Sequence, residues 1–449
     1  MQYIPDVWAL DYVLGLFFLV IIYFGGFVYK TNKLERSNSY QYFVVALSAK
    51  VIGGLGFMFL SMYYWKAGDT FTYYKAADGF TDLMISDPVE SLKLIISSGK
   101  NVNWFKYDFA TGSHRLLGDS VASFTMVKIT AVLNLLCFKS YLTTTIVFSL
   151  ISFFGVWNMY FVFCKIYPYL RKILLFTFFF IPSVILWGSG ILKDTITISA
   201  IGWLVYAFIN IILLKRKKTL ALILVVVSTL TLFLLKPYIL YVLYPALFVW
   251  FQSDLEKVIS NNLIRKLFAP LIAVGILAGA YFLTRQLSSN AGKYNINKME
   301  STLKGFQTWH TTVNETKDQS GYSLGEMDFS PTGLIKKIPA AVNVTFFRPY
   351  LWEVRNTATL LGAFEGLIVT IFSLFLLLRY RFRVFKIIYK NKDVMFLLIF
   401  ALFFGAIVGI SSYNFGALSR YKMPAQIFYV LALVLIFDKV RTNSNRLNK

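Results

Sequence analysis

Long apolar runs alternate with short polar segments along most of this chain. A run of about 18 or more apolar residues with few charges is long enough to cross a bilayer as a helix. The runs that approach or exceed this length are 12–29, 41–63, 141–163, 172–188, 195–214, 219–235, 237–252, 267–284, 357–378, 394–412 and 423–438. The pattern predicts an all-α, polytopic membrane protein with about 11 transmembrane helices.

Basic residues cluster between these runs and indicate how the chain is oriented. Cytoplasmic loops of membrane proteins are enriched in lysine and arginine. The basic segments are 30–36, 165–172, 215–218, 257–266, 379–392 and 439–449. If all of them are cytoplasmic, the N-terminus lies outside and the C-terminus lies in the cytoplasm. The long polar loops 64–140 and 285–356 are then outside.

The sequence therefore predicts a multi-pass protein of the cytoplasmic (inner) membrane of a bacterium. We expect an additional N-terminal span with its cytoplasmic loop over residues 1–40. A larger transmembrane domain, with both long outer loops, is expected over 41–449. Frequent Lys, Asn, Ile and Phe are typical of an AT-rich bacterial genome.

The segment 120–138 tests this scheme. It is apolar enough for a short helix, but if it spanned the membrane, every later loop would change sides and the basic segment 215–218 would lie outside. We therefore predict an amphipathic helix at the membrane surface, with Lys128 and Asn134 on its polar side. The alternative is an additional span, offset by a break missed elsewhere.

The composition argues against several other classes of protein. Charged residues make up 15% of the chain, against about 25% in soluble domains. The net charge of +23 lies mostly at the ends of apolar runs, which argues against nucleic acid as a partner. Cys137 and Cys164 give neither a metal-binding spacing nor a disulfide framework. Glycine-rich phosphate-binding motifs are absent, which disfavours an ATP-driven enzyme.

Two aspartates stand at the start of predicted outer elements. In KAGDTFTYYKAAD, Asp69 follows the second apolar run by about six residues, where it is able to accept a proton or hold a metal ion. In WGSGILKDTITI, Lys193 and Asp194 follow a Gly-Ser-Gly turn that allows close backbone approach, as at an anion or sugar site. The alternatives are that both aspartates are helix N-caps and that Lys193 is an interface anchor.

Two further segments combine cations with aromatic residues. FFRPYLWEVRN carries Arg348, Glu353 and Arg355, and arginine suits phosphate because its guanidinium binds two oxygens at once. Glu365 lies about two turns inside the next run and needs an arginine or lysine as its partner. SRYKMPAQ carries Arg420, Tyr421 and Lys422, which are alternatively interface anchors. Weaker candidates are Lys236 in the turn Lys236-Pro237-Tyr238, His310, and His114.

These segments resemble the GT-C superfamily of integral membrane glycosyltransferases, in particular its ArnT-like and protein-mannosyltransferase-like branch. GDTFTYY is similar to the family's DExxY pattern, with Asp69 and Tyr73 at matching positions. SGILKD is similar to the segment that places a second aspartate at the start of a span. SRYKMPAQ is similar to the family's RYxLPxxP motif. The chain departs from the family in having Asp69-Thr70 for its acidic pair and an additional span, 12–29.

The resemblance implies an inverting transferase that moves a sugar from a polyprenyl-phosphate donor to a glycan, lipid or protein acceptor on the outer face. It implies Asp69 as general base and Asp194 as the group that binds a divalent metal (Mg or Mn) or orients the acceptor. The remaining implied ligands of the substrates are Tyr73, Lys193, Arg348, Glu353, Arg355, Arg420 and Tyr421, with Trp309, Tyr350 and Trp352 stacking on sugar faces. The resemblance also implies that the donor's lipid tail lies between helices, and membrane lipid is a further expected partner.

Two alternatives stay open. A polysaccharide polymerase of the O-antigen (Wzy-like) type would use the same outer arginines but take a second lipid-linked repeat unit as its acceptor. A non-enzymatic transporter or flippase of lipid-linked glycans would predict internal repeats and polar residues near the bilayer midplane. The sequence has no evident repeat, and its polar candidates gather at the predicted outer interface.

Overall fold

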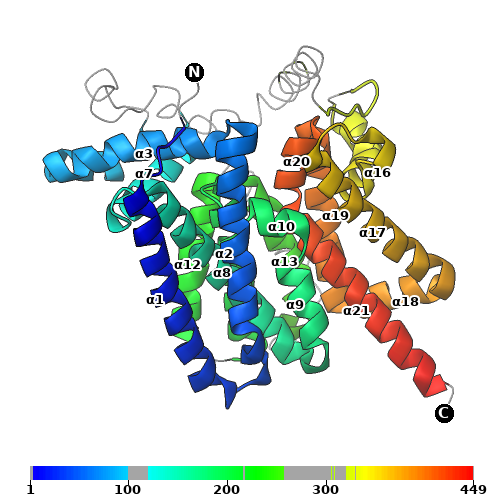
Figure 1. Ribbon diagram of the computed structural model, residues 1–449. Helices are drawn as coiled ribbons and strands as arrows, with labels where there is room; N and C mark the ends of the chain where they lie inside the picture. The colour runs from blue at the N-terminus through cyan, green and yellow to red at the C-terminus, as the bar shows by residue number, and fades with distance from the viewer. Residues whose placement is uncertain are drawn as a thin grey trace. The chain divides into compact units, whose positions relative to one another are not determined.

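The computed structural model describes residues 4–99, 120–215, 218–256, 305, 308, 320–328 and 330–447. Within these ranges the chain is helical, apart from loops, turns and one isolated bridge between Gly321 and Asn414 (Figure 1). The all-α prediction is confirmed for the described ranges. Two compact units are present: the first is Met1–Phe180 with Val184–Pro237, and the second is Ile181–Ser183 with Tyr238–Lys449.

Eight helices of the described ranges are long and apolar enough to cross a membrane. This confirms a membrane-embedded helical protein, although the predicted number of about 11 spans is not reached in those ranges. The eight helices are Ala9–Leu34, Asn38–Trp65, Tyr141–Ile166, Lys193–Ile212, Lys218–Leu235, Thr359–Tyr380, Lys392–Ser412 and Met423–Thr442.

The three other predicted runs behave differently. Run 172–188 is not one helix: α9 (Arg171–Phe179) ends before Pro182, and α10 (Pro182–Trp187) begins there. Proline fits the first turn of a helix but interrupts a continuing one, because it lacks the N–H donor. Run 237–252 lies in α13 (Tyr238–Glu256). The apolar part of this helix, Tyr238–Gln252, is too short to count as a span. Run 267–284 lies outside the described residues.

The first unit is organised around α8 (Tyr141–Ile166), which packs against α1 (Ala9–Leu34), α2 (Phe43–Phe59) and α11 (Lys193–Ile212). Glycines let α8 and α11 touch closely. A Cβ on Gly155 would lie 2.3 Å from the Ser199 carbonyl oxygen, and one on Gly202 would lie 2.2 Å from the Gly155 oxygen. Close backbone approach at small residues is how helices pack where lipid removes the hydrophobic driving force. The helix α12 (Lys218–Leu235) covers α11.

The predicted outer loop 64–140 contains helices rather than irregular chain. They are α3 (Asp69–Ser86), α4 (Pro88–Ile96) and α7 (Val121–Leu136). Figure 1 shows α3 lying crosswise to α1 and α2, and α3 packs along α7. The predicted helix in 120–138 is therefore confirmed as a helix, and at 16 residues it is shorter than a span.

The prediction that Asn134 lies on a polar, solvent-facing side of α7 is wrong. Asn134 is fully buried, and its amide donates to Asp78 at 3.2 Å while its oxygen accepts from Thr144 at 3.2 Å. Lys128 is half-buried and caps the end of α4, donating to the carbonyls of Ile95 at 2.8 Å and Ser97 at 2.5 Å. Both polar groups hold α7 to its neighbours because buried hydrogen-bonding groups need partners.

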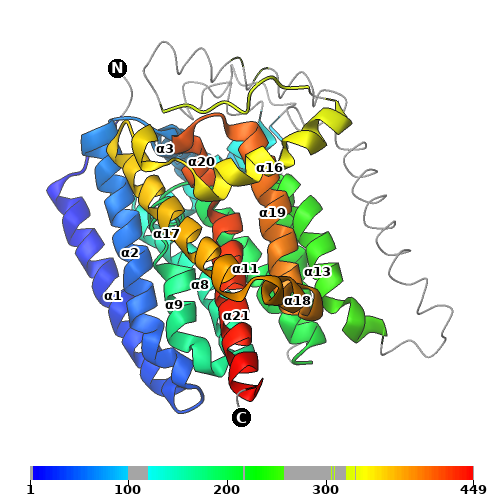
Figure 2. The same ribbon diagram turned by 90° about the vertical axis from the view of Figure 1, so that its right-hand side faces the viewer.

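The second unit is organised around α19 (Lys392–Ser412), which packs against α13, α16 (Pro331–Phe347) and α21 (Met423–Leu447) (Figure 2). Trp250 stacks on Phe396 at 4.2 Å between ring centroids, and its indole N–H donates to Asp393 at 2.7 Å. Along the same unit run η6 (Leu351–Glu353), α17 (Thr357–Tyr380), α18 (Phe382–Lys390) and α20 (Phe415–Tyr421).

The predicted basic loop 379–392 forms the short helix α18. It buries Val384 and Ile387, while Phe382, Phe385 and Tyr389 are exposed among basic residues. A helix of this kind suits a membrane–water interface. The predicted division into residues 1–40 and 41–449 stays a prediction. In the structure α1 packs on α2 and α8 within the first unit.

Candidate functional site

Asp69 opens α3 at an exposed position. The chain leaves the second span through Lys66, with φ of 49°, and Gly68, with φ of 144°. Only glycine adopts the latter backbone without strain, and Gly68 rather than Asp69 is the N-cap of α3. The N-cap alternative for Asp69 is therefore wrong. Its carboxylate lies in the exposed first turn, where the helix dipole favours a negative charge.

Tyr73 and Lys193 connect the two acidic motifs. Tyr73 is buried one turn after Asp69, and the Lys193 ammonium lies 5.3 Å from the centroid of its ring. The same ammonium donates a hydrogen bond to the Ser123 hydroxyl at 2.9 Å. The fold thus brings α3, α7 and the start of α11 together around Lys193, which remains partly exposed.

Asp194 lies in a buried ion pair that the sequence did not indicate. Its carboxylate accepts a hydrogen bond from the ammonium of Lys236, and both side chains are buried. Asp194 is in the first turn of α11, and Lys236 directly follows the last turn of α12. Each charge therefore sits at the helix end whose dipole favours it.

The Gly-Ser-Gly turn before Lys193 is buried, not open to a ligand. Its carbonyls already accept hydrogen bonds from protein side chains. The Gly188 carbonyl accepts from the Ser152 hydroxyl at 2.6 Å and from the Lys50 ammonium at 3.1 Å. The Ser189 carbonyl accepts from Ser149 at 3.0 Å, and the Gly190 carbonyl accepts from Thr195 at 2.6 Å. A Cβ on Gly190 would lie 2.1 Å from the Phe57 ring. The glycines serve packing against α2, which corrects the expected anion or sugar site at this turn.

Metal binding has no supporting cluster in the ranges that the structure describes. Those ranges contain no group of three His, Cys, Asp or Glu side chains that could hold a metal ion. The charge of Asp194 is balanced by Lys236. The divalent metal at Asp194 stays a prediction from the resemblance alone.

In the second unit, Arg348 and Glu353 bind each other. The guanidinium of Arg348 donates to both carboxylate oxygens of Glu353, which also accepts from the Tyr350 amide at 2.8 Å. Burial acts to raise the pKa of Glu353, but these hydrogen bonds and the charge of Arg348 outweigh it and lower the pKa. The hydrogen bonds that Arg348 donates to Glu353 in turn raise the pKa of Arg348. The pair fixes the loop between α16 and α17.

The other predicted ligands of this unit lie nearer its surface. Arg355 is exposed after η6, and Arg420 is partly exposed on α20 with its guanidinium 5.6 Å from the Tyr421 ring centroid. Trp352 is 82% exposed and stacks on Tyr350, with the ring centroids 4.9 Å apart. Trp309, His310 and His114 lie outside the described residues.

Glu365 has the lysine partner that its depth requires. It is buried in α17 and accepts from the backbone N–H of Ser183 at 3.0 Å and from its hydroxyl at 3.1 Å. The Lys422 ammonium is 3.6 Å from Glu365, so the predicted lysine or arginine partner is confirmed. Lys422 and Gln426, one turn apart on the chain, are fully buried, and among the described residues neither the Lys422 ammonium nor the Gln426 amide has a hydrogen-bond partner.

Sequence reasoning missed several of these contacts. Lys236 was visible only as a weak candidate in a turn, although a lysine at the end of an apolar run signals a cation in need of a partner. Ser123 and Ser183 carry no sequence signal, because a serine in an apolar helix is commonplace.

The fold defines a multi-pass helical membrane protein in which Asp194 and Lys236 pair at helix ends, while Glu365 lies inside a helix. Comparison with protein-family models, with curated proteins and with solved structures gives no match. Function is therefore argued from the chain's own residues.

Proposed function

We propose that the chain is a membrane glycosyltransferase that moves a sugar from a polyprenyl-phosphate donor to an acceptor on the outer face of the cytoplasmic membrane, in cell-surface glycan synthesis. One observation carries the proposal: the Lys193 ammonium lies 5.3 Å from the ring centroid of Tyr73, which stands one turn after Asp69 on α3. These three residues belong to the two motifs that resemble the GT-C superfamily. The exposed carboxylate of Asp69 is suited to act as a base, and the partly exposed ammonium of Lys193 is suited to bind an anion.

The proposed reaction is a single displacement. The Asp69 carboxylate takes the proton of an acceptor hydroxyl, and the hydroxyl oxygen forms a bond to the anomeric carbon of the sugar. The bond from that carbon to the phosphate oxygen breaks, and polyprenyl phosphate leaves with the electron pair. Attack opposite the leaving group inverts the anomeric centre. Lys193 stabilises the negative charge that develops on the phosphate.

Within the second unit, Arg355 and Arg420 have side chains that are at least partly exposed, and they stay predicted substrate ligands. Arg348 is already bound by Glu353 at both carboxylate oxygens. We therefore propose that the Arg348–Glu353 pair positions the loop that carries Arg355.

A purified protein in nanodiscs, supplied with a radiolabelled pool of polyprenyl-phosphate sugars, tests this proposal. Asp69→Asn should lower donor consumption by about 100-fold or more, the size expected for loss of a general base. Asp82→Asn, on the same helix and paired with Lys139 at 2.7 Å, is the matched control and should keep activity. Equal unfolding temperatures of Asp69→Asn and wild type establish that the loss is chemical.

A polysaccharide polymerase is the second candidate, favoured by the exposed Arg355, which lies in the same loop as Arg348. It predicts products that grow by whole repeat units and activity that survives Asp69→Asn but not Arg355→Gln. If wild type consumes no donor yet moves lipid-linked glycan across vesicles, both enzymatic proposals fail and the transporter remains.

A further inference from the structure

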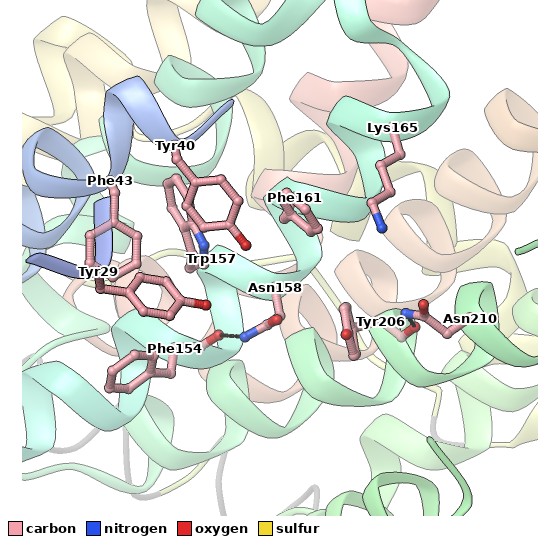
Figure 3. Close-up of a pocket in the computed structure, with 10 residues that line it drawn as sticks. All are labelled: Tyr29, Tyr40, Phe43, Phe154, Trp157, Asn158, Phe161, Lys165, Tyr206 and Asn210. Atoms are coloured by element: carbon pink, nitrogen blue, oxygen red, sulfur yellow. Dashed lines mark hydrogen bonds between the residues drawn. The ribbon is translucent and has the colours of Figure 1, made fainter. Parts of the chain in front are cut away.

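The first unit contains a cavity of about 190 Å³ away from the residues discussed so far. It lies among α1, η1 (Asn38–Tyr42), α2, α8 and α11 (Figure 3). We call it the aromatic pocket, and its lining residues are Tyr29, Tyr40, Phe43, Phe154, Trp157, Asn158, Phe161, Lys165, Tyr206 and Asn210. None of them belongs to the proposed catalytic groups.

The walls of the aromatic pocket are rings packed against one another. Phe43 meets Trp157 edge to face at 4.9 Å between centroids, and Tyr40 meets Phe161 at 5.2 Å. Tyr40, Phe43 and Trp157 are all less than one-tenth exposed. Such interlocked rings have little freedom to collapse into the space, so the cavity is preformed.

Polar groups point into this aromatic frame. Figure 3 shows the hydroxyls of Tyr29 and Tyr40, the amide of Asn158 and the ammonium of Lys165 directed toward the central space. The amide N–H of Asn158 donates to the Phe154 carbonyl at 2.7 Å, an anchor that fixes the side chain. A ligand in the pocket therefore meets hydrogen-bonding groups on more than one side.

One end of the pocket lies at headgroup depth. Lys165 is the residue before the end of α8 at Ile166, and Asn210 lies two residues before the end of α11 at Ile212. Both helices are long enough to span a membrane. Helix ends of this kind lie where the hydrocarbon gives way to lipid headgroups. Tyr29 and Phe154 remain 42% and 44% exposed, which leaves the pocket open at its side.

The charge around the pocket favours an anion. Its lining includes Lys165 and no acidic residue. The Lys33 ammonium lies 5.7 Å from the ring centroid of Tyr29, which adds a second cation at the rim. Basic pockets between membrane helices on the cytoplasmic side are sites for anionic lipid headgroups.

The volume limits the size of the ligand. Pockets for drug-sized molecules measure about 300–1,000 Å³. A cavity of about 190 Å³ is too small for a nucleotide sugar and matches a phosphate with a few attached carbons. From size, charge and depth together, we propose that the aromatic pocket binds the glycerophosphate group of an anionic phospholipid. This proposal is independent of the proposed transferase reaction.

Native mass spectrometry of the full chain released from nanodiscs tests the proposal. The discs contain phosphatidylcholine with or without phosphatidylglycerol. Wild type should retain phosphatidylglycerol, and Lys165→Gln should lower the retained fraction about fivefold, the factor expected for one lysine near a lipid phosphate. Lys172→Gln, which removes an exposed lysine outside the lining, is the matched control and should retain the lipid as wild type does.

A second variant keeps the charge and changes the pocket. Asn158→Leu removes the amide from a helical position that leucine suits, and it should also lower retention of phosphatidylglycerol. Equal lowering by Lys165→Gln and Lys172→Gln would show general attraction to basic residues and overturn the proposal. Tighter binding of soluble glycerol 3-phosphate than of phosphatidylglycerol would show that the pocket recognises the free phosphoester, and it would equally overturn the assignment to a lipid.

Discussion

Each unit of the molecule contains one buried carboxylate paired with a lysine, and the two pairs differ in how completely they are satisfied. In the first unit, Lys236 donates directly to Asp194. In the second, the Lys422 ammonium stands 3.6 Å from Glu365 and makes no hydrogen bond. The Glu365 oxygens accept instead from Ser183.

The difference follows from where the residues stand on their helices. Asp194 opens α11 and Lys236 closes α12, two helices that pack together, so their dipoles and the pair support each other. Glu365 lies about two turns inside α17, away from the helix end, and relies on Ser183 for its hydrogen bonds. In the first pair the lysine and the carboxylate are hydrogen-bonded to each other and hold α11 to α12. In the second pair the ammonium lies beyond hydrogen-bond distance of the carboxylate.

The largest expected effect is the loss of one partner of the first pair. Lys236→Met removes the ammonium that pairs with the buried Asp194 carboxylate, and breaking such a pair typically costs about 3–5 kcal/mol of stability. Denaturant unfolding of the detergent-purified protein measures it. Adding Asp194→Asn to Lys236→Met should recover most of the loss, because no buried charge then remains. If Lys236→Met lowers the unfolding free energy by less than about 1 kcal/mol, the Asp194–Lys236 pair does not stabilise the packing of α11 and α12.

The second pair should respond less to the same change. Lys422→Met removes an ammonium that makes no hydrogen bond, while Glu365 keeps both contacts with Ser183. We expect a loss of about 1–3 kcal/mol, in the range for a buried polar group that loses part of its compensation. The same unfolding assay compares the two lysine variants directly. The contrast between the pairs is wrong if Lys422→Met costs as much as Lys236→Met.

Replacing Gln426 is expected to raise the unfolding free energy, in contrast to the two lysine variants. Both polar atoms of its buried amide lack partners, and an unsatisfied buried group costs about 1–3 kcal/mol. Gln426→Leu should therefore raise the unfolding free energy by about 1 kcal/mol. Asn134→Leu is the control: this buried amide is fully engaged, so its replacement should destabilise the protein. A loss of stability in Gln426→Leu would mean that its amide is satisfied.

The smallest effect is expected at the partly exposed Arg348–Glu353 pair, because solvent screens it. The pKa of Glu353 is lowered from its ordinary 4.5 in the folded protein. The pair therefore contributes its full stability above about pH 4.5 and loses it as the pH falls through the lowered pKa. Glu353→Gln should lower the unfolding temperature by about 1–3 °C at pH 7, and by progressively less as the pH falls through the lowered pKa of Glu353. Glu326→Gln, at an exposed position, should show no such dependence.

The sequence by itself determined that this protein is an all-helical membrane protein, and it located eight of the long helices. Apolar runs of span length leave few alternatives, since every backbone polar group must be satisfied inside lipid. Proline interrupted the run 172–188 where a length count alone predicted one helix. The need of Glu365 for a cation was also readable, because a buried carboxylate cannot remain without compensation.

Only the tertiary structure decided which groups meet. Asp194 and Lys236 are 42 residues apart in the chain, and Lys193 reaches Ser123 across 70 residues. The Gly-Ser-Gly turn had the composition of an open ligand loop, yet α2 and α8 bury it. Hydropathy records how apolar each segment is, but not which faces of two helices touch. That choice depends on side-chain packing between distant segments, and packing fixed both the ion pairs and the aromatic pocket.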